Sequence, residues 1–222
     1  MTFSLTNRLK ESLELLPKTQ SLLDIGADCG FLAISFEKKC SKVYASENKK
    51  GPYNSLVSTI KKNDSSVIPL YGDGLEILPN DVETISILGM GGLTINRILT
   101  KNMDKLKNIK YILVSPQSSI HLTIKTLNDL GYKNIKGKYI FETRYYPVLL
   151  YAKGKEELTD LELFFGKVPF NNKDENLIKY IDSEINRYTN IGYKLTKRNL
   201  SMYNIFIQAR EILKVDESER EK

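Results

Sequence analysis

The chain has few of the residues that build metal centres and disulfides. Its 222 residues include one histidine, His121, and two cysteines, Cys29 and Cys40. A histidine-based metal site or catalytic triad has little support, and the cysteine spacing matches no zinc motif. We therefore expect no metal and no disulfide, and we expect His121 to be an ordinary surface or helix residue.

Long apolar runs are also missing. No stretch approaches the roughly 20 apolar residues of a membrane span, and the first ten residues hold no apolar signal region. These absences predict a cytoplasmic protein without a membrane partner. Hydrophobic residues make up 41% of the chain, which suits one α/β domain with a sizeable core plus a small appendage.

Positive charge is in moderate excess and unevenly distributed. Lys and Arg number 33 against 27 Asp and Glu, a net charge of +6, which is consistent with a polyanionic partner. The many lysines, asparagines and isoleucines also fit a genome bias that raises charge without function. Residues 101–155 alone hold eleven Lys/Arg and three Asp/Glu.

This basic segment mixes cations with aromatic rings, an arrangement that suits phosphates and unstacked bases. The alternative is an edge hairpin whose solvated lysines discourage strand pairing. The cations are Lys133, Lys136, Lys138 and Arg144, and the interleaved rings are Tyr132, Tyr139, Tyr145 and Tyr146.

Apolar periodicity predicts a helix over 4–16 followed by alternating strands and helices. This alternation indicates a mostly parallel sheet, and two final strands with no helix between them indicate an antiparallel hairpin. The order fits the seven-stranded Rossmann-like sheet of class I methyltransferases and does not fit the dehydrogenase arrangement. The expected strands are 21–25, 42–47, 67–71, 83–88, 109–115, 135–142 and 146–152, and the expected helices are 30–38, 51–62, 74–78, 92–101 and 119–130.

The pattern changes after residue 153, where the predicted catalytic domain (1–153) ends. Residues 154–172 are expected to form a connector, 173–215 a coiled-coil-like α-helical hairpin with apolar stripes, and 216–222 a frayed tail. The hairpin is either an RNA-gripping arm or a packing appendage or dimer contact. Its candidate RNA-binding cations are Lys194, Lys197 and Arg198.

The first strand ends in a turn that favours a nucleotide-like ligand. Asp24 and Gly26 close an apolar run, and a second run ends 21 residues later in Glu47; a strand, glycine turn, helix and acid-tipped strand make half of a nucleotide site. Dinucleotide sites need three glycines around a pyrophosphate, whereas this turn has two and carries the carboxylates of Asp24 and Asp28. Carboxylates repel phosphate and suit a cation, which favours S-adenosylmethionine over NAD.

Two further glycine turns follow predicted strands. An acid between glycines, as in Gly72-Asp73-Gly74, can accept the amino group of adenine, and ligands of open α/β sheets bind beyond the strand ends. The alternative is an α/β protein with tight turns and no ligand. The predicted cofactor-binding residues are Asp24, Gly26, Glu47, Asn48, Gly72, Asp73, Gly74, Gly89, Met90 and Gly91.

These motifs, in this order, resemble the bacterial tRNA (adenine-22-N1)-methyltransferase family, TrmK, over roughly residues 3–214. The resemblance implies a Rossmann-like catalytic domain, S-adenosylmethionine as the methyl donor, and methylation of adenine N1 in the D-arm of tRNA. The matching residues are Asn7-Arg8-Leu9, Asp24-Ile25-Gly26-Ala27-Asp28, Glu47, Gly51-Pro52-Tyr53, Gly72-Asp73-Gly74-Leu75, Gly89-Met90-Gly91-Gly92 and Tyr145-Tyr146.

The departures from this family lie on the substrate side. The family usually has Asp-His-Ala-Tyr-Leu-Pro where this chain has 28–33 as Asp-Cys-Gly-Phe-Leu-Ala, and Gln-Pro-Asn where this chain has Ser115-Pro116-Gln117. We expect Asp28 to be catalytic by accepting a hydrogen bond from the adenine amino group, with donor binding as its competing role. Alternatives are a methyltransferase for another RNA base or a small molecule, and a non-catalytic RNA-binding protein. We expect a monomer.

Overall fold

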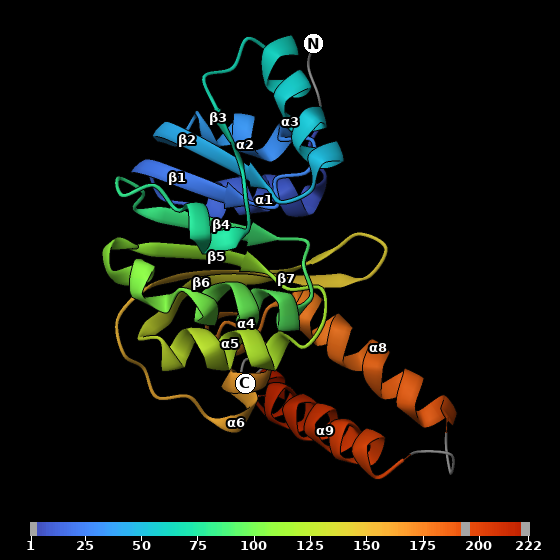
Figure 1. Ribbon diagram of the computed structural model, residues 1–222. Helices are drawn as coiled ribbons and strands as arrows, with labels where there is room; N and C mark the ends of the chain where they lie inside the picture. The colour runs from blue at the N-terminus through green and yellow to red at the C-terminus, as the bar shows by residue number, and fades with distance from the viewer. Residues whose placement is uncertain (1–3, 192–195, 219–222) are drawn as a thin grey trace.

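The computed structural model describes residues 4–191 and 196–218. Seven strands form one sheet in the order β3-β2-β1-β4-β5-β7-β6 (Figure 1). Strands β1 to β5 are parallel, and β7 runs antiparallel to both β5 and β6. This confirms the predicted seven-stranded sheet with its terminal hairpin. The strands are β1 (Thr19–Ile25), β2 (Cys40–Glu47), β3 (Ile68–Tyr71), β4 (Thr84–Leu88), β5 (Tyr111–Ser115), β6 (Tyr132–Phe141) and β7 (Tyr145–Lys153).

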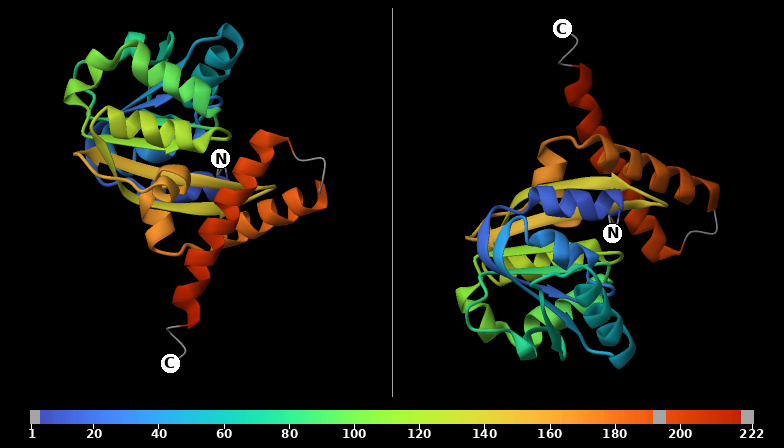
Figure 2. Two further views of the ribbon diagram at one scale, coloured as in Figure 1. Left: turned by 90° about the horizontal axis from the view of Figure 1, so that it is seen from below. Right: turned by 90° about the horizontal axis from the view of Figure 1, so that it is seen from above.

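Helices cover both faces of the sheet (Figure 2). One apolar core lies under α1, α2 and α3 and another under α4 and α5, so the central strands are buried on both faces and need apolar side chains throughout. This explains continuous apolar runs such as Ile112-Leu113-Val114 of β5. The helices are α1 (Asn7–Leu15), α2 (Phe31–Phe36), α3 (Lys50–Lys62), α4 (Gly92–Lys101) and α5 (Ile120–Asp129), with short 3₁₀ turns η1 (Gly74–Ile77) and η2 (Met103–Asn108).

The C-terminal part has its own core. Helices α8 (Glu175–Ile191) and α9 (Lys197–Ser218) pack together and extend away from the sheet as the predicted helical hairpin (Figure 2). Two helices, α6 (Asp160–Phe165) and α7 (Lys167–Asn171), lie in the segment expected to be a connector. They are too short for a periodic apolar pattern to reveal. Helix α9 continues past residue 216, where the frayed tail was predicted to begin.

The direction of the strands determines where a ligand can bind. The carboxyl ends of β1, β2, β3, β4 and β5 meet at one edge of the sheet. Strand β6 runs parallel to β5, so the tip of the β6–β7 hairpin lies at this edge and the start of β6 at the other. Among the described residues, no helix has the length and apolar character to cross a bilayer.

Candidate active site

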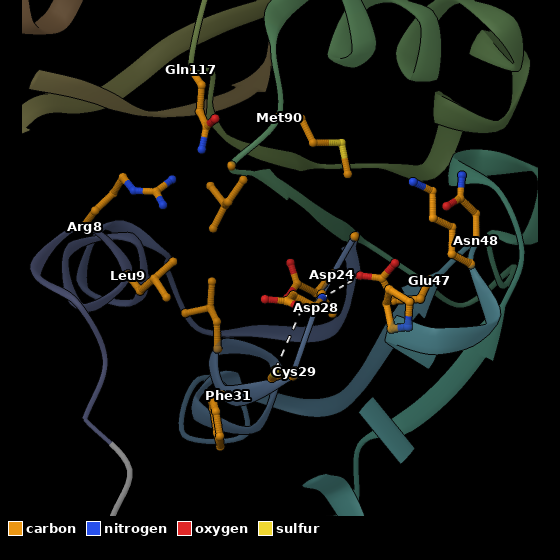
Figure 3. Close-up of a pocket in the computed structure, with 18 residues that line it drawn as sticks. Arg8, Leu9, Asp24, Asp28, Cys29, Phe31, Glu47, Asn48, Met90 and Gln117 are labelled. Atoms are coloured by element: carbon orange, nitrogen blue, oxygen red, sulfur yellow. Dashed lines mark hydrogen bonds between the residues drawn. The ribbon is translucent and has the colours of Figure 1, made fainter. Parts of the chain in front are cut away.

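A cavity of about 520 Å³ opens at the carboxyl ends of β1 and β4 (Figure 3). A smaller cavity of about 70 Å³ adjoins it and shares Gly26, Glu47, Asn48 and Met90 with it. The turns after four parallel strands therefore converge on one continuous site, as the sequence predicted. The predicted cofactor residues that line the two cavities are Asp24, Gly26, Glu47, Asn48, Gly72, Asp73, Gly74, Gly89 and Met90.

Asp24 is a buried carboxyl group at the floor of the larger cavity, with 4% of its surface exposed. The Ser86 hydroxyl donates a hydrogen bond to its Oδ1 at 2.5 Å. Burial raises the pKa of Asp24 to about 6; the Ser86 hydrogen bond opposes this rise and the negative charge of Glu47 adds to it. A cationic ligand would favour the ionised form, because an opposite charge lowers the pKa of a carboxyl group.

Glu47 organises the turn that follows β1. Its Oε1 accepts a hydrogen bond from the backbone N–H of Asp28 at 2.6 Å, drawn in Figure 3. Asp28 has a left-handed backbone with φ of +50°, a conformation that Asp and Asn adopt more readily than most residues. Its side chain is exposed and lines the larger cavity. The acid predicted to bind the donor therefore also positions the predicted catalytic residue.

Gly26 brings the backbone close to the space between the two cavities. Its φ is +73°, and a Cβ at this position would overlap the Cε atom of Met90. Met90 lines both cavities. In the smaller cavity, the Asn48 amide donates a hydrogen bond to Asp73 Oδ1 at 3.0 Å, which fixes the carboxylate that follows β3.

Arg8 is a site residue whose role the sequence did not reveal. It lies on α1, and its side chain, 14% exposed, faces the larger cavity beside Gln117 (Figure 3). Its Nη1 donates to Ser115 Oγ at 3.5 Å, and its Nε lies 3.6 Å from Glu142 Oε2. The family resemblance included Arg8 without giving it a function, and the amphipathic pattern of α1 predicts only a packing helix.

The last two glycines of the turn after β4 serve packing. Gly91, predicted to bind the cofactor, lines neither cavity; a Cβ there would lie 3.0 Å from Ser118 Oγ. A Cβ on Gly92 would overlap the backbone carbonyl oxygens of Ser118 and Ser119. The start of α4 therefore packs directly against the loop after β5, and this contact needs residues without side chains.

The family model of tRNA (adenine(22)-N(1))-methyltransferases, TrmK, matches residues 22–217. The chain belongs to the TrmK family. The tRNA (adenine(22)-N(1))-methyltransferase of Bacillus subtilis (strain 168) is 31% identical over 124 residues, which cover 53% of this chain and 52% of that enzyme. The match thus spans about half the length of this relative.

Solved structures share the fold of this TrmK chain over nearly its whole length. A Streptococcus agalactiae protein of the NADB-Rossmann superfamily has a TM-score of 0.85 and 25% identity, covering 96% of this chain and 97% of its own. TrmK of M. capricolum, solved with S-adenosyl-homocysteine, has a TM-score of 0.82 and 24% identity, covering 95% of this chain and 98% of its own.

The basic residues predicted to bind RNA do not form one patch in this TrmK chain. Lys133 is the second residue of β6, eight residues and roughly 26 Å of strand from the end of β6 at the hairpin tip. Lys136 lies in the middle of β6, and Lys138 pairs with Glu11 of α1 at 2.7 Å. Arg144 alone of the four lies at the tip beside the site, with its guanidinium 4.9 Å from the centre of the Tyr146 ring.

The other candidates are divided between exposed, buried and undescribed positions. Lys197 is exposed at the start of α9, whereas Lys194 and the side chain of Arg198 lie outside the described residues. The interpretation of Tyr132 and Tyr139 as base-stacking rings is wrong. Both rings are buried and their hydroxyls donate to backbone carbonyls, because Tyr132 packs into the core under α4 and α5 and Tyr139 into the core of the C-terminal part.

Metal ligands do not gather in the part of the chain that the structure describes, where no group of three or more His, Cys, Asp and Glu could hold an ion. His121, expected to be an ordinary surface or helix residue, is exposed on α5. Its ring stacks on the ring of Phe164, with the two ring centres 5.3 Å apart.

Proposed function

We propose that this chain transfers a methyl group from S-adenosylmethionine to N1 of adenine 22 in the D-arm of tRNA. The family match over residues 22–217 supports this activity. One structural observation carries it further: a buried carboxyl group, Asp24, and a hydrogen-bonded one, Asp73, lie in two adjoining cavities that meet at Gly26.

The donor set fits S-adenosylmethionine, which has an ammonium and a sulfonium group and no phosphate. Asp24 would hold the ammonium group, Glu47 the ribose hydroxyls and Asp73 the adenine amino group. The absence of a Cβ at Gly26 admits a ligand close to the backbone. When bound, the donor supplies a methyl group that is activated by the positive charge on sulfur. The structure of M. capricolum TrmK in complex with S-adenosyl-homocysteine supports this assignment.

The acceptor must be an unpaired or flipped adenine, because base pairing covers N1. Asp28 would accept a hydrogen bond from the exocyclic amino group, aim the N1 lone pair at the methyl group, and stabilise the positive charge that develops on the base. Leu9 and Phe31, which is 38% exposed, line the same cavity and offer apolar surface to the ring.

The remaining cations would bind the tRNA backbone. We retain Arg144 and Lys197 from the predicted set and add Arg8, because these lie at the site or on the helical hairpin beside it. Lys133 and Lys136 lie too far along β6 to contact the nucleotide that is methylated. A tRNA substrate agrees with the expected cytoplasmic location, and the monomer stays a prediction.

Methyl transfer to an unmodified tRNA transcript tests this proposal. We expect radiolabel from S-adenosylmethionine to enter the wild-type transcript as 1-methyladenosine, and reverse transcription to stop one nucleotide before position 22. A transcript with guanine at position 22 is the matched control and should take up no label. Label at another base, or donor binding without any transfer to tRNA, would contradict the assignment.

A further inference from the structure

A separate cavity of about 440 Å³ lies between the catalytic domain and the helical hairpin. Its walls come from the loop after β5, the start of α5, the tip of the β6–β7 hairpin, and α6, α8 and α9. Gln117 lines both this cavity and the larger active-site cavity. The two spaces are therefore neighbours, separated by one short loop. We refer to this second space as the hairpin cavity.

Aromatic rings dominate the inner wall of the hairpin cavity. Tyr145 of β7, Phe164 of α6 and Tyr180 of α8 line it and are partly exposed, and Tyr188 of α8, which also lines it, is buried in the core behind them. Tyr145 and Tyr180 pack with ring centres 6.3 Å apart. Such rings, supported by a core behind them, form a surface on which any base can stack.

Polar groups, one cation and the carboxylate of Glu184, which pairs with Arg187 at 2.5 Å, complete this cavity. The Ser183 hydroxyl and the Asn199 amide line it and can form hydrogen bonds with base edges. Arg144 lines the same cavity and lies 4.9 Å from the centre of the Tyr146 ring, which Arg8 also approaches at 4.9 Å. One ring thus separates a cation of the active-site cavity from a cation of the hairpin cavity.

We propose that the hairpin cavity binds the base of a nucleotide next to the methylated adenine, while Arg8 and Arg144 bind the phosphate between the two nucleotides. This inference rests on the proposed function. Flipping one base out of an RNA helix unstacks its neighbour, and the shared wall at Gln117 puts the second space within reach of the adjoining nucleotide. A base matches the combination of stacked rings, amide and hydroxyl groups, and a nearby cation.

Filling the cavity tests the proposal. Ser183→Trp places a bulky ring from α8 into the hairpin cavity, and Asn186→Trp is the matched control, because Asn186 is exposed on the same helix and does not line the cavity. We expect the Ser183 variant to raise KM for tRNA about tenfold, with kcat and the Kd for S-adenosylmethionine unchanged. The control should behave like the wild type, and both variants should keep its unfolding temperature.

An RNA lacking one base identifies the occupant. We expect an abasic site on one side of the target adenine to raise KM for the wild type about tenfold and to add nothing in the Ser183→Trp variant. The cavity does not hold a base if no abasic position raises KM in this way. The same conclusion follows if the abasic site and the Ser183→Trp substitution raise KM independently of each other. Equal KM values for the two tryptophan variants would also overturn the inference. Failure of the wild type to methylate any tRNA would instead refute the proposed function.

Discussion

The backbone N–H of Asp28 donates a hydrogen bond to the carboxylate of Glu47 at 2.6 Å, across the gap between the ends of β1 and β2. One oxygen of Glu47 thus holds the turn that presents Asp28 to the cavity, and the other is left for a ligand. With the roles proposed for Glu47 and Asp28, this single side chain would couple donor binding to the positioning of the acceptor base.

Glu47→Gln should weaken donor binding roughly 10- to 100-fold, because hydrogen bonds to a charged group contribute about 1.5–3 kcal/mol. The amide oxygen can still accept the Asp28 N–H, so kcat at saturating donor should change little. Glu47→Ala removes both contacts and should lower kcat as well. Calorimetry and initial rates measure these effects. Glu37→Gln is the control, since Glu37 accepts a backbone N–H from Ser66 at 2.8 Å away from the site.

Asp28→Asn should reduce kcat about 100-fold, the scale on which charge stabilisation in a transition state acts, and leave the donor Kd within a few-fold. Asparagine tolerates the left-handed backbone of this position. Asp64→Asn is matched to it, because Asp64 is also exposed and has a φ of +49°. A collapse of donor affinity in the Asp28 variant would assign this carboxylate to donor binding.

Gly26→Ala should weaken donor binding and destabilise the fold. The φ of +73° is unfavourable for alanine, and the new Cβ would displace the terminal methyl group of Met90, which lines both cavities. Gly131→Ala is the control for the backbone effect alone, because Gly131 has a φ of +78° and nothing within 4 Å of its Cβ position. This variant should lose about 1 kcal/mol of unfolding free energy. Urea unfolding compares the two. Adding Met90→Ala to the Gly26 variant should bring its loss of unfolding free energy closer to that of the Gly131 variant. If the loss stays the same, the contact with Met90 is not its cause.

The pKa of Asp24 predicts opposite pH trends for stability and for ligand affinity. Because burial raises this pKa from 3.8 to about 6, the folded state holds a proton that the unfolded state loses, and stability falls as pH rises from about 4 to 6. The loss in the free energy of unfolding, relative to low pH where Asp24 is protonated in both states, reaches about 3 kcal/mol above pH 6. Asp24→Asn should therefore be more stable than the wild type at pH 7.5, as urea unfolding across this pH range can show.

Affinity for a cationic donor should follow the ionised form of Asp24. The wild-type Kd should rise as pH falls below 6, approaching about tenfold per pH unit. The Asn variant should bind weakly with little pH dependence. Calorimetry between pH 5 and pH 8 would contradict this role if both proteins showed the same slope.

Arg8→Met should raise KM for tRNA severalfold and leave donor Kd unchanged, because the guanidinium faces the cavity beside Gln117 and does not line the smaller cavity. Lys10→Met is the control, since Lys10 is exposed on the same helix. Steady-state rates at varied tRNA concentration separate the two variants. Equal KM values would restrict Arg8 to packing against Tyr146 and Glu142.

Local chemistry made the meeting of three acids at the cavities predictable. Asp24, Glu47 and Asp73 each stand at the end of an apolar run, and parallel strands bring such ends together whatever the rest of the chain does. Arg8 could not be found in this way, because its place depends on how α1 crosses the sheet and on contacts with residues more than 100 positions away.

Charge counting was a poorer guide than strand geometry. Lys133, Lys136 and Lys138 are close in sequence, but β6 spreads them along the sheet and Lys138 pairs with α1. Tyr132 and Tyr139, which flank these lysines in the sequence, are both buried. The hairpin cavity was likewise beyond prediction, since helices, loop and strand tip form it only after they pack.

Gly92 contacts no predicted ligand group, but the backbone of Ser118 and Ser119 leaves no room for a side chain there. In a library of single substitutions at every position, changes at Gly92 should reduce activity as much as changes at the acids that line the cavities. Glycine can thus be required at a position because any side chain would clash there. A search for binding residues among the positions that tolerate least change would therefore also find Gly92, whose role is to let the start of α4 pack against the loop after β5.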